Sequence, residues 1–344
     1  HSFPTRRSSD LLLITLPCIK ISFKRFNPLS KENSSNVKGL LCILIFYHHF
    51  TGWFVNKGII FYVLSHIGSF IVGVFFFLSA YGLIKAYPGD VKFSFLLKRF
   101  VKILVPYWLC EILYSVISSA FDIQIKCEVN FRNIFLSLLP IKEIVENSWF
   151  VGAILVAYVM FFIGKKILPK VDLALKTAVL MLIFSAVFYK HLDYWTTFFA
   201  FPLGLFFGEK EDKISSLSAG KRIAVIAASA ILCAAATVPK FYGFSIGSNL
   251  YMNVSDFLTS SLFAVFVYFV MSFVKIGNPV LSFFGKISYE VYLIHGIAIR
   301  IAAEIFGIQN SIPFFFLSFA VFVLLSYIVS TLSSVIIKPI VKRL

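Results

Sequence analysis

Charged residues are scarce in this sequence, at 14% of 344 residues, and cysteines number only five. Hydrophobic residues make up 59% of the chain, where soluble domains keep about half, so disordered, fibrous and ordinary cytosolic proteins are excluded. The cysteines form no CxxC pair, so neither a disulfide framework nor a metal site is indicated (Cys18, Cys42, Cys110, Cys127 and Cys233). No internal repeat is evident. Because many transporters consist of two inverted halves, this absence is weak evidence against a transporter.

Apolar residues dominate the sequence, and the mean hydropathy is +0.89. About two hundred apolar residues are enough for roughly ten membrane spans of about 20 residues each. Runs such as 37–50 and 314–328 stay apolar for longer than a barrel strand, whose residues alternate between polar and apolar. The sequence therefore predicts an all-α fold, a polytopic bundle of transmembrane helices.

The predicted membrane spans are ten apolar windows of the sequence, and the basic residues between them indicate their orientation. The windows lie near 38–55, 66–86, 103–121, 147–164, 172–188, 193–208, 223–238, 255–274, 284–303 and 313–336. Lys and Arg gather in the loops that follow even-numbered windows, for example Lys98 and Arg99, then Lys165 and Lys166. The positive-inside rule then places both termini in the cytoplasm, so the net charge of +16 reports membrane orientation and no nucleic-acid partner is expected.

The predicted spans divide the chain into three segments. These are a cytoplasmic N-terminal segment 1–36, a transmembrane domain 37–338 and a cytoplasmic tail 339–344. Residues 1–11, HSFPTRRSSDL, differ in composition from the rest of the chain and resemble a translated sequencing-adapter fragment, with a signal peptide as the alternative. No loop is long enough to form a second soluble domain, and the longest outward loop covers about 122–147.

Ionisable side chains inside the windows are candidates for function, because burying them in a membrane is costly. His48 and His49 lie midway along the first window, and Lys38 precedes His49 by eleven residues. That spacing places Lys38 and His49 on one helix face, roughly 16 Å apart. An imidazole here suits a general base. The alternative is a hydrogen bond to a neighbouring helix, which the pattern supports equally for His49 and favours for His48.

A basic amphipathic segment, Phe95–Trp108, leads into the third window as FLLKRFVKILVPYW. Arg99 and Lys102 are three residues apart and share a face of the expected helix. Together with Lys98 they form a cluster able to hold the phosphates of a nucleotide-like donor. The pattern alone favours a simpler role, an anionic-lipid anchor that sets the topology.

Other polar residues of the windows have two open interpretations. Ser288, Tyr292 and His295 form a polar stripe on the ninth window, where contact with a substrate and interhelical hydrogen bonding are equally supported. Glu111, in the third window, is a candidate partner for a protonated histidine or for any other basic side chain. Close helix packing is favoured for the small residues of the second window (Gly73, Ser79 and Gly82). In the fourth window, an interfacial position is favoured for Trp149 and a buried hydroxyl for Tyr158.

Five segments in this order resemble membrane acyltransferase family 3, the integral O-acyltransferases of bacterial cell-surface sugars. They are KGLLCILIFYHHF, GVFFFLSAYGL, KRFVKILVPYW, SWFVGAILVAY and SYEVYLIH, and the resemblance runs from about residue 37 to the end. It aligns Lys38 and His49 with the family's Arg and catalytic His of the first span, and Arg99 and Lys102 with its RxxR entry. Lys replaces Arg at positions 38 and 102, without the bidentate geometry of Arg, and Ala80 replaces the usual Gly.

The resemblance implies transfer of an acyl group, most commonly acetyl, from acyl-CoA to a hydroxyl of a cell-surface glycan or lipid-linked sugar, in the inner (cytoplasmic) membrane. It implies that His49 acts as general base or carries the acyl group covalently, with Glu111 as the second catalytic residue. The implied CoA-binding residues are Lys38, Lys98, Arg99 and Lys102. The implied residues of the substrate pocket are Ser79, Trp149, Ser288, Tyr292 and His295. Segment 37–338 is then the acyltransferase-like domain, and we expect no fused extracytoplasmic domain after KPIVKRL.

Two other classes of function stay open at this stage. A proton-coupled transporter or flippase for a glycan or small metabolite would use the same buried His and Glu as a proton relay. A structural scaffold of surface-polysaccharide assembly would need His49 only for stability. Dependence on Arg99 and on a thioester donor separates an acyltransferase from both.

Overall fold

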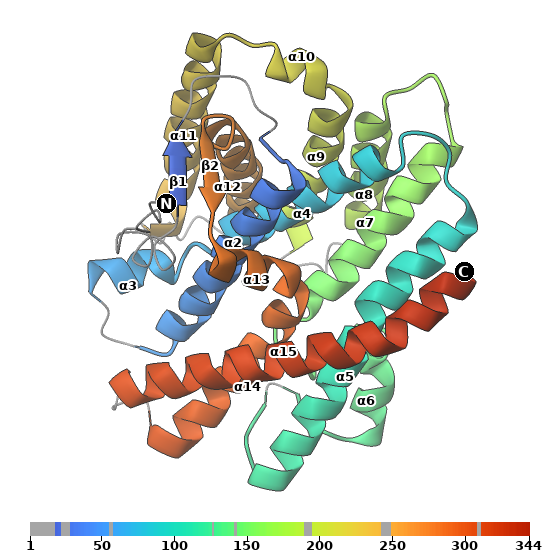
Figure 1. Ribbon diagram of the computed structural model, residues 1–344. Helices are drawn as coiled ribbons and strands as arrows, with labels where there is room; N and C mark the ends of the chain where they lie inside the picture. The colour runs from blue at the N-terminus through green and yellow to red at the C-terminus, as the bar shows by residue number, and fades with distance from the viewer. Residues whose placement is uncertain are drawn as a thin grey trace, which may run out of the picture.

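The chain folds into a bundle of long helices, seen in a computed structural model (Figure 1). The described residues are 18–21, 28–54, 58–125, 127–140, 143–188, 195–241, 249–307 and 311–344. Both interpretations of residues 1–11 therefore concern residues outside the described part.

The elements follow one another as helices with few interruptions. In chain order they are β1 (Cys18–Ile21), α2 (Lys31–Gly52), α3 (Ile59–Leu64), α4 (Gly68–Ala86), α5 (Phe93–Phe121), α6 (Phe131–Ser137), α7 (Trp149–Lys166), α8 (Leu173–Phe188), η2 (Trp195–Phe199), α9 (Ala200–Glu209), α10 (Glu211–Ser215), α11 (Ala219–Phe241), α12 (Asn249–Val270), β2 (Val274–Gly277), α13 (Pro279–Lys286), α14 (Ser288–Phe306) and α15 (Ser311–Arg343).

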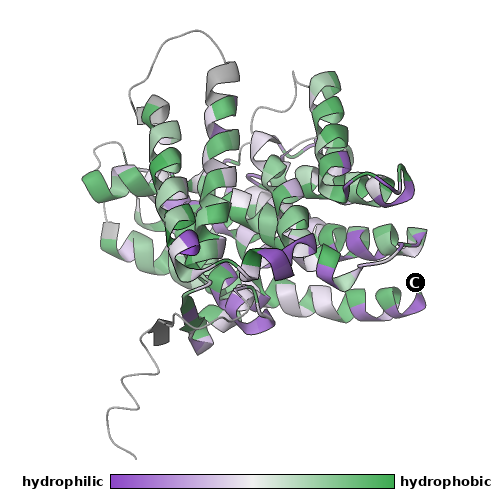
Figure 2. Ribbon diagram, turned by 90° about the horizontal axis from the view of Figure 1, so that it is seen from above, coloured by the Kyte–Doolittle hydropathy of each residue, from purple (hydrophilic) through white to green (hydrophobic). Residues whose placement is uncertain are grey.

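The helices have the length and composition of membrane spans. Among the described residues, six are long and apolar enough to cross a membrane: Gly68–Ala86, Phe93–Phe121, Trp149–Lys166, Ala219–Val238, Asn253–Val270 and Ile312–Arg343. Figure 2 shows the corresponding green stretches, with purple at the C-terminal end of α15. The predicted class, an all-α multi-pass membrane protein, is confirmed. The count of ten spans and the cytoplasmic termini stay predictions, although each of the ten windows overlaps a helix.

The connection between the eighth and ninth windows is more structured than the hydropathy pattern predicts. Strand β2 pairs antiparallel with β1, Cys18 opposite Gly277, and α13 follows at once. Asn278 starts α13, because its side chain accepts hydrogen bonds from the backbone N–H groups of Val280 and Leu281. Pro279 occupies the first turn, where its missing N–H costs nothing.

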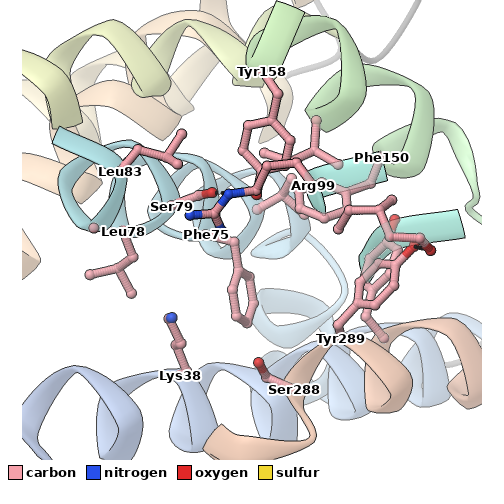
Figure 3. A pocket seen from close by; sticks show the side chains of 15 residues that line it. Lys38, Phe75, Leu78, Ser79, Leu83, Arg99, Phe150, Tyr158, Ser288 and Tyr289 are labelled. Atoms are coloured by element: carbon pink, nitrogen blue, oxygen red, sulfur yellow. Dashed lines mark hydrogen bonds between the residues drawn. The ribbon is translucent and has the colours of Figure 1, made fainter. Parts of the chain in front are cut away.

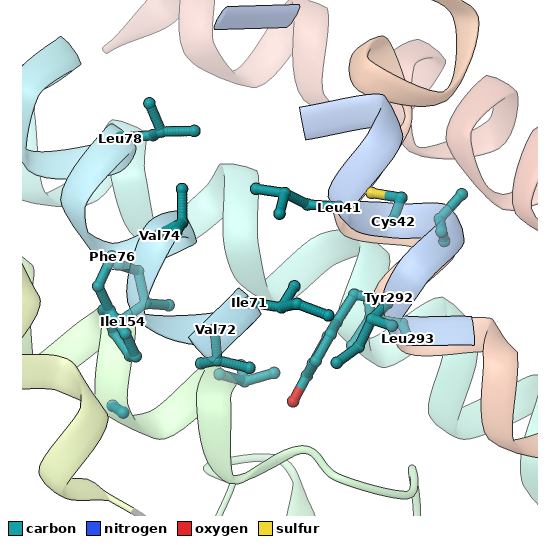
Figure 4. Close-up of a cluster of buried hydrophobic side chains, with 14 of the residues drawn as sticks. Leu41, Cys42, Ile71, Val72, Val74, Phe76, Leu78, Ile154, Tyr292 and Leu293 are labelled. Atoms are coloured by element: carbon teal, nitrogen blue, oxygen red, sulfur yellow. The ribbon is translucent and has the colours of Figure 1, made fainter. Parts of the chain in front are cut away.

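Helix α13 lies against α2 at a very short distance. A Cβ on Gly39 would lie 1.9 Å from the carbonyl oxygen of Leu281, so only glycine permits this contact. Helix α14 packs in turn on α2, α5 and α15, while α4 packs on α9 and α12. These contacts hold α2, α4 and α14 around one apolar cluster that includes Cys42, Ile71 and Leu293 (Figure 4).

The basic entry to the third window is helical, as its amphipathic pattern predicts, and it belongs to the same helix as the window. Helix α5 starts at Phe93 and continues for 29 residues with Pro106 inside it. Because the helix is continuous, Lys98, Arg99 and Lys102 point in directions set by helical geometry rather than by a flexible loop.

Candidate active site

A first cavity of about 330 Å³ lies between α2, α4, α5, α7 and α14. Figure 3 shows Lys38 of α2 and Arg99 of α5 pointing into it from different sides. Its lining also includes polar side chains that the sequence singled out and apolar ones around them (Ser79, Tyr158, Ser288, Tyr289, Tyr292, Val72, Phe75, Leu78 and Ile103). Two cations in a largely apolar cavity form a site suited to an anionic ligand.

Aromatic rings surround the Arg99 guanidinium. Its Cζ lies 5.6 Å from the ring centroids of Tyr87 and Phe95 and 5.7 Å from that of Tyr158. Such contacts are typical of cation–π interactions. The hydroxyls of Tyr158 and Ser79 lie 3.0 Å apart in a hydrogen bond, which joins the ring to α4. Arg99 is therefore held at a fixed place in the cavity wall.

The other two cations of the basic segment do not line this cavity. Lys102 is exposed and Lys98 is partly exposed, and the cavity residue on the next turn after Arg99 is Ile103. A spacing of three residues leaves a helical pair about 60° apart, whereas a spacing of four leaves it about 40° apart. The predicted Arg99–Lys102 pair is thus separated: Arg99 faces inward and Lys102 faces outward.

A second cavity of about 330 Å³ is lined by three of the four histidines in the described part of the chain, His48, His49 and His66. His49 lines it together with Trp149 and Tyr292, both predicted pocket residues. The remaining residues come from α2, the α3–α4 turn, α4, η2, α12 and the segment before α7, and most of them have polar side chains (Ile45, His48, Ser65, His66, Gly68, Ser69, Val72, Asn147, Thr197 and Asp256). This chemistry suits a ligand with several hydroxyl groups.

The two neighbouring histidines of α2 have different surroundings. His48 Nδ1 lies 3.0 Å from the carbonyl oxygen of Leu64, which is the interhelical role that the sequence favoured for it. The His49 ring packs against the His295 ring with centroids 4.4 Å apart. Within the described part of the chain, neither ring nitrogen of His49 forms a hydrogen bond. His49 is thus the α2 imidazole that can act on a ligand in the cavity.

Val72 and Tyr292 line both cavities. Both side chains are buried, and Figure 4 shows them in the cluster that joins α4 and α14. Because two residues belong to both walls, the Lys38–Arg99 cavity and the His49 cavity adjoin each other, with these two side chains between them. A small group bound in one cavity at this point is close to the other.

Comparison with known proteins identifies the family of the chain. The family model described as Acyltransferase domain, that of membrane acyltransferase family 3, matches residues 33–331. The chain belongs to this family. Membership indicates a membrane acyltransferase. No curated protein and no solved structure matched the chain.

Of the residues that the resemblance singled out, most line one of the two cavities, whereas Glu111, His295, Lys98 and Lys102 line neither. Glu111, a candidate catalytic residue, is buried in α5 but lines neither cavity, and its polar neighbours include Tyr107 and Ser137. His295 is fully buried beside His49. Ser288 and Tyr292, two residues of the polar stripe in the ninth window, line the first cavity.

The structure adds residues of the His49 cavity that the sequence did not single out, above all His66, Asn147 and Asp256. Asp256 is the second residue of the window 255–274, and a carboxylate at that depth is a weaker signal than one at the centre of a span. His66 and Asn147 lie at predicted window edges, where polar residues are ordinary and carry no such signal.

Proposed function

We propose that this acyltransferase moves an acetyl group from acetyl-CoA to a hydroxyl of a cell-surface glycan or lipid-linked sugar, with His49 as general base. The observation that carries the proposal is that a cavity with two cations adjoins a cavity with an available imidazole, with Val72 and Tyr292 between them. The first cavity suits an anionic thioester donor, and the second suits a hydroxyl acceptor.

The donor enters by the Lys38–Arg99 cavity, on the side where the basic loops predict cytoplasm. A volume of about 330 Å³ lies at the small end of ligand pockets, which span roughly 300–1,000 Å³, so it receives the thioester arm. Lys38 and Arg99 neutralise the pyrophosphate where that arm leaves the cavity. The nucleotide stays outside this cavity, near Lys98 and the exposed Lys102 of α5.

The acceptor enters by the His49 cavity, where Asp256, Ser69 and Trp149 are placed to orient a sugar. A His49 ring nitrogen takes the proton of the acceptor hydroxyl as its oxygen attacks the thioester carbonyl carbon. The new C–O bond forms, the C–S bond breaks, and the proton passes from His49 to the leaving CoA thiolate. Tyr292 lies at the junction where the carbonyl must be presented.

The direct test is incorporation of label from acetyl-CoA, radiolabelled on the acetyl group, into base-labile ester in the glycan and lipid fractions of membranes. Three preparations are compared: the intact protein, His49→Ala at matched expression and an empty vector. We expect label only with the intact protein. Label that survives in His49→Ala at the intact rate would refute the role of His49, and no label from any preparation across several acceptor-bearing hosts would refute acyl transfer.

A further inference from the structure

Asn147 lies directly before α7 and contacts α14 twice. Its side-chain Nδ2 lies 3.3 Å from Nε2 of His295, and its backbone carbonyl oxygen accepts a hydrogen bond of 2.5 Å from the Tyr292 hydroxyl. Its φ is 60°, in the left-handed region that asparagine tolerates better than most residues. A residue held in this backbone conformation, with two contacts to the catalytic cavity, has more than a linking role.

The hydrogen bonds of His295 define one tautomer. Its Nδ1 lies 2.5 Å from the carbonyl oxygen of Tyr292, and a carbonyl only accepts, so Nδ1 carries a proton. The Asn147 Nδ2 donates, so Nε2 of His295 accepts and carries none. His295 is then neutral, and both its nitrogens are occupied.

This protonation state affects His49, whose ring is 4.4 Å away between centroids. A neutral His295 does not repel the positive charge that His49 gains when it takes a proton, whereas a charged His295 would repel it. The other titratable groups that line the His49 cavity are His48, His66, Asp256 and Tyr292. Because His295 Nε2 already accepts from Asn147, it cannot also accept the proton of a substrate hydroxyl.

A second set of contacts keeps Asn147 in place. The carboxylate of the preceding residue, Glu146, forms an ion pair with Arg300 of α14, and Arg300 Nη1 donates to the carbonyl oxygen of Gln124 at 2.7 Å. Gly296 makes room for this contact, since a Cβ there would lie 2.7 Å from Glu146 Oε2. The segment before α7 is thus docked along α14 from Tyr292 to Arg300.

We propose that Asn147 is a positioning residue that keeps His295 neutral, so that His49 and not His295 takes the substrate proton. The inference rests on the proposed function for its catalytic part only. Its structural part, the neutral Nδ1–H form of His295 set by Asn147, holds for the protein without any substrate.

The substitution that tests this is Asn147→Asp, which has the same shape but offers only acceptor oxygens. His295 must then donate from both nitrogens and becomes a cation. Nitrogen NMR of the full-length protein in bilayers, with ¹⁵N-labelled histidine, reports the two forms, and His295→Gln assigns the resonance. We expect one protonated and one bare nitrogen on His295 in the intact protein, and two protonated nitrogens in Asn147→Asp. Asn130→Asp is the matched control, since Asn130 caps α6 through a side-chain oxygen that aspartate also supplies.

The pH profile of acetyl transfer provides the functional readout. A cation beside His49 opposes its protonation, so Asn147→Asp should move the acid limb to lower pH and reduce the maximal rate by about tenfold or more. If Asn147 had only a structural role, the substitution would lower the rate and leave the acid limb of the pH profile at its original pH. Asn147→Ser, which keeps a hydroxyl donor, should restore most of the rate and the original limb.

Two outcomes overturn the proposal: a doubly protonated His295 in the intact protein, or His295 resonances unchanged in a folded Asn147→Asp. If the NMR result is as expected but no preparation transfers acetyl, the proposed function fails and the positioning of His295 stands. If acetyl is transferred with an unmoved acid limb in Asn147→Asp, the functional part of the inference fails and the proposed function stands.

Discussion

The ring of His49 lies against the ring of His295, with centroids 4.4 Å apart and planes 30° apart. The first ring comes from α2 and the second from α14, helices that are distant in the sequence and packed together. His295 is fully buried with hydrogen bonds to both nitrogens, whereas His49 borders the cavity. The contact therefore brings together two imidazoles that we expect to play different roles.

His49→Gln should lower the rate of acetyl transfer by about 10²–10⁴-fold, the usual contribution of a general base. Its KM for acetyl-CoA should stay within about twofold, because the donor cavity is lined by other residues. Steady-state kinetics on purified protein in lipid would measure both constants.

The matched control is His48→Gln, in which the side-chain amide can donate to the Leu64 carbonyl as His48 Nδ1 does. It should keep most of the rate. Equal losses in the two variants would show that the pair has only a structural role.

Arg99→Ala should weaken binding of acetyl-CoA by roughly ten- to a hundredfold, because a hydrogen bond to a charged group is worth about 1.5–3 kcal/mol. Lys102→Ala, three residues away on the outer face of α5, should cost less than about fivefold, as exposed ion pairs contribute about 0–1 kcal/mol. Binding titrations with a non-hydrolysable acetyl-CoA analogue would compare them. A larger loss in Lys102→Ala would place the phosphates elsewhere.

Val72→Phe should fill the junction of the two cavities. Val72 is 4% exposed and lines both of them, so the larger ring obstructs the passage of the acyl group. We expect at least a tenfold loss of transfer with little change in binding of acetyl-CoA, since a misplacement of about 1 Å can cost 10²-fold. Unchanged transfer by a folded variant would mean that the two substrates meet at another place.

Gly73→Ala should destabilise the protein by about 1–3 kcal/mol, the usual cost of overpacking. A Cβ at Gly73 would lie 2.5 Å from Ser260 Cβ on α12, whereas a Cβ at Gly82, on the same helix, meets nothing within 4 Å. Thermal unfolding in detergent should give a lower midpoint for Gly73→Ala and an unchanged or higher one for Gly82→Ala. The opposite order would contradict the packing of α4 on α12.

Much of the fold could be predicted because long apolar runs identify helices directly. The sheet of β1 and β2 and the short helix α13 could not, because they depend on pairing between segments more than 250 residues apart and on the cap at Asn278. Arg99 and Lys102 belong to one sequence motif, so their different directions in the folded helix could not be predicted from that motif alone. The two cavities required knowledge of which helices are neighbours, so Asn147 and His66 could not be connected with His49 from spacing alone.

The central claim is that donor and acceptor reach one junction from opposite cavities. Sealed membrane vesicles of each orientation test it when acetyl-labelled acetyl-CoA is added outside. We expect base-labile ester to form only in vesicles whose exposed face carries the Lys38–Arg99 cavity, and Arg99→Ala to abolish most of it. Equal labelling from either face, or labelling from the His49 face alone, would contradict the account.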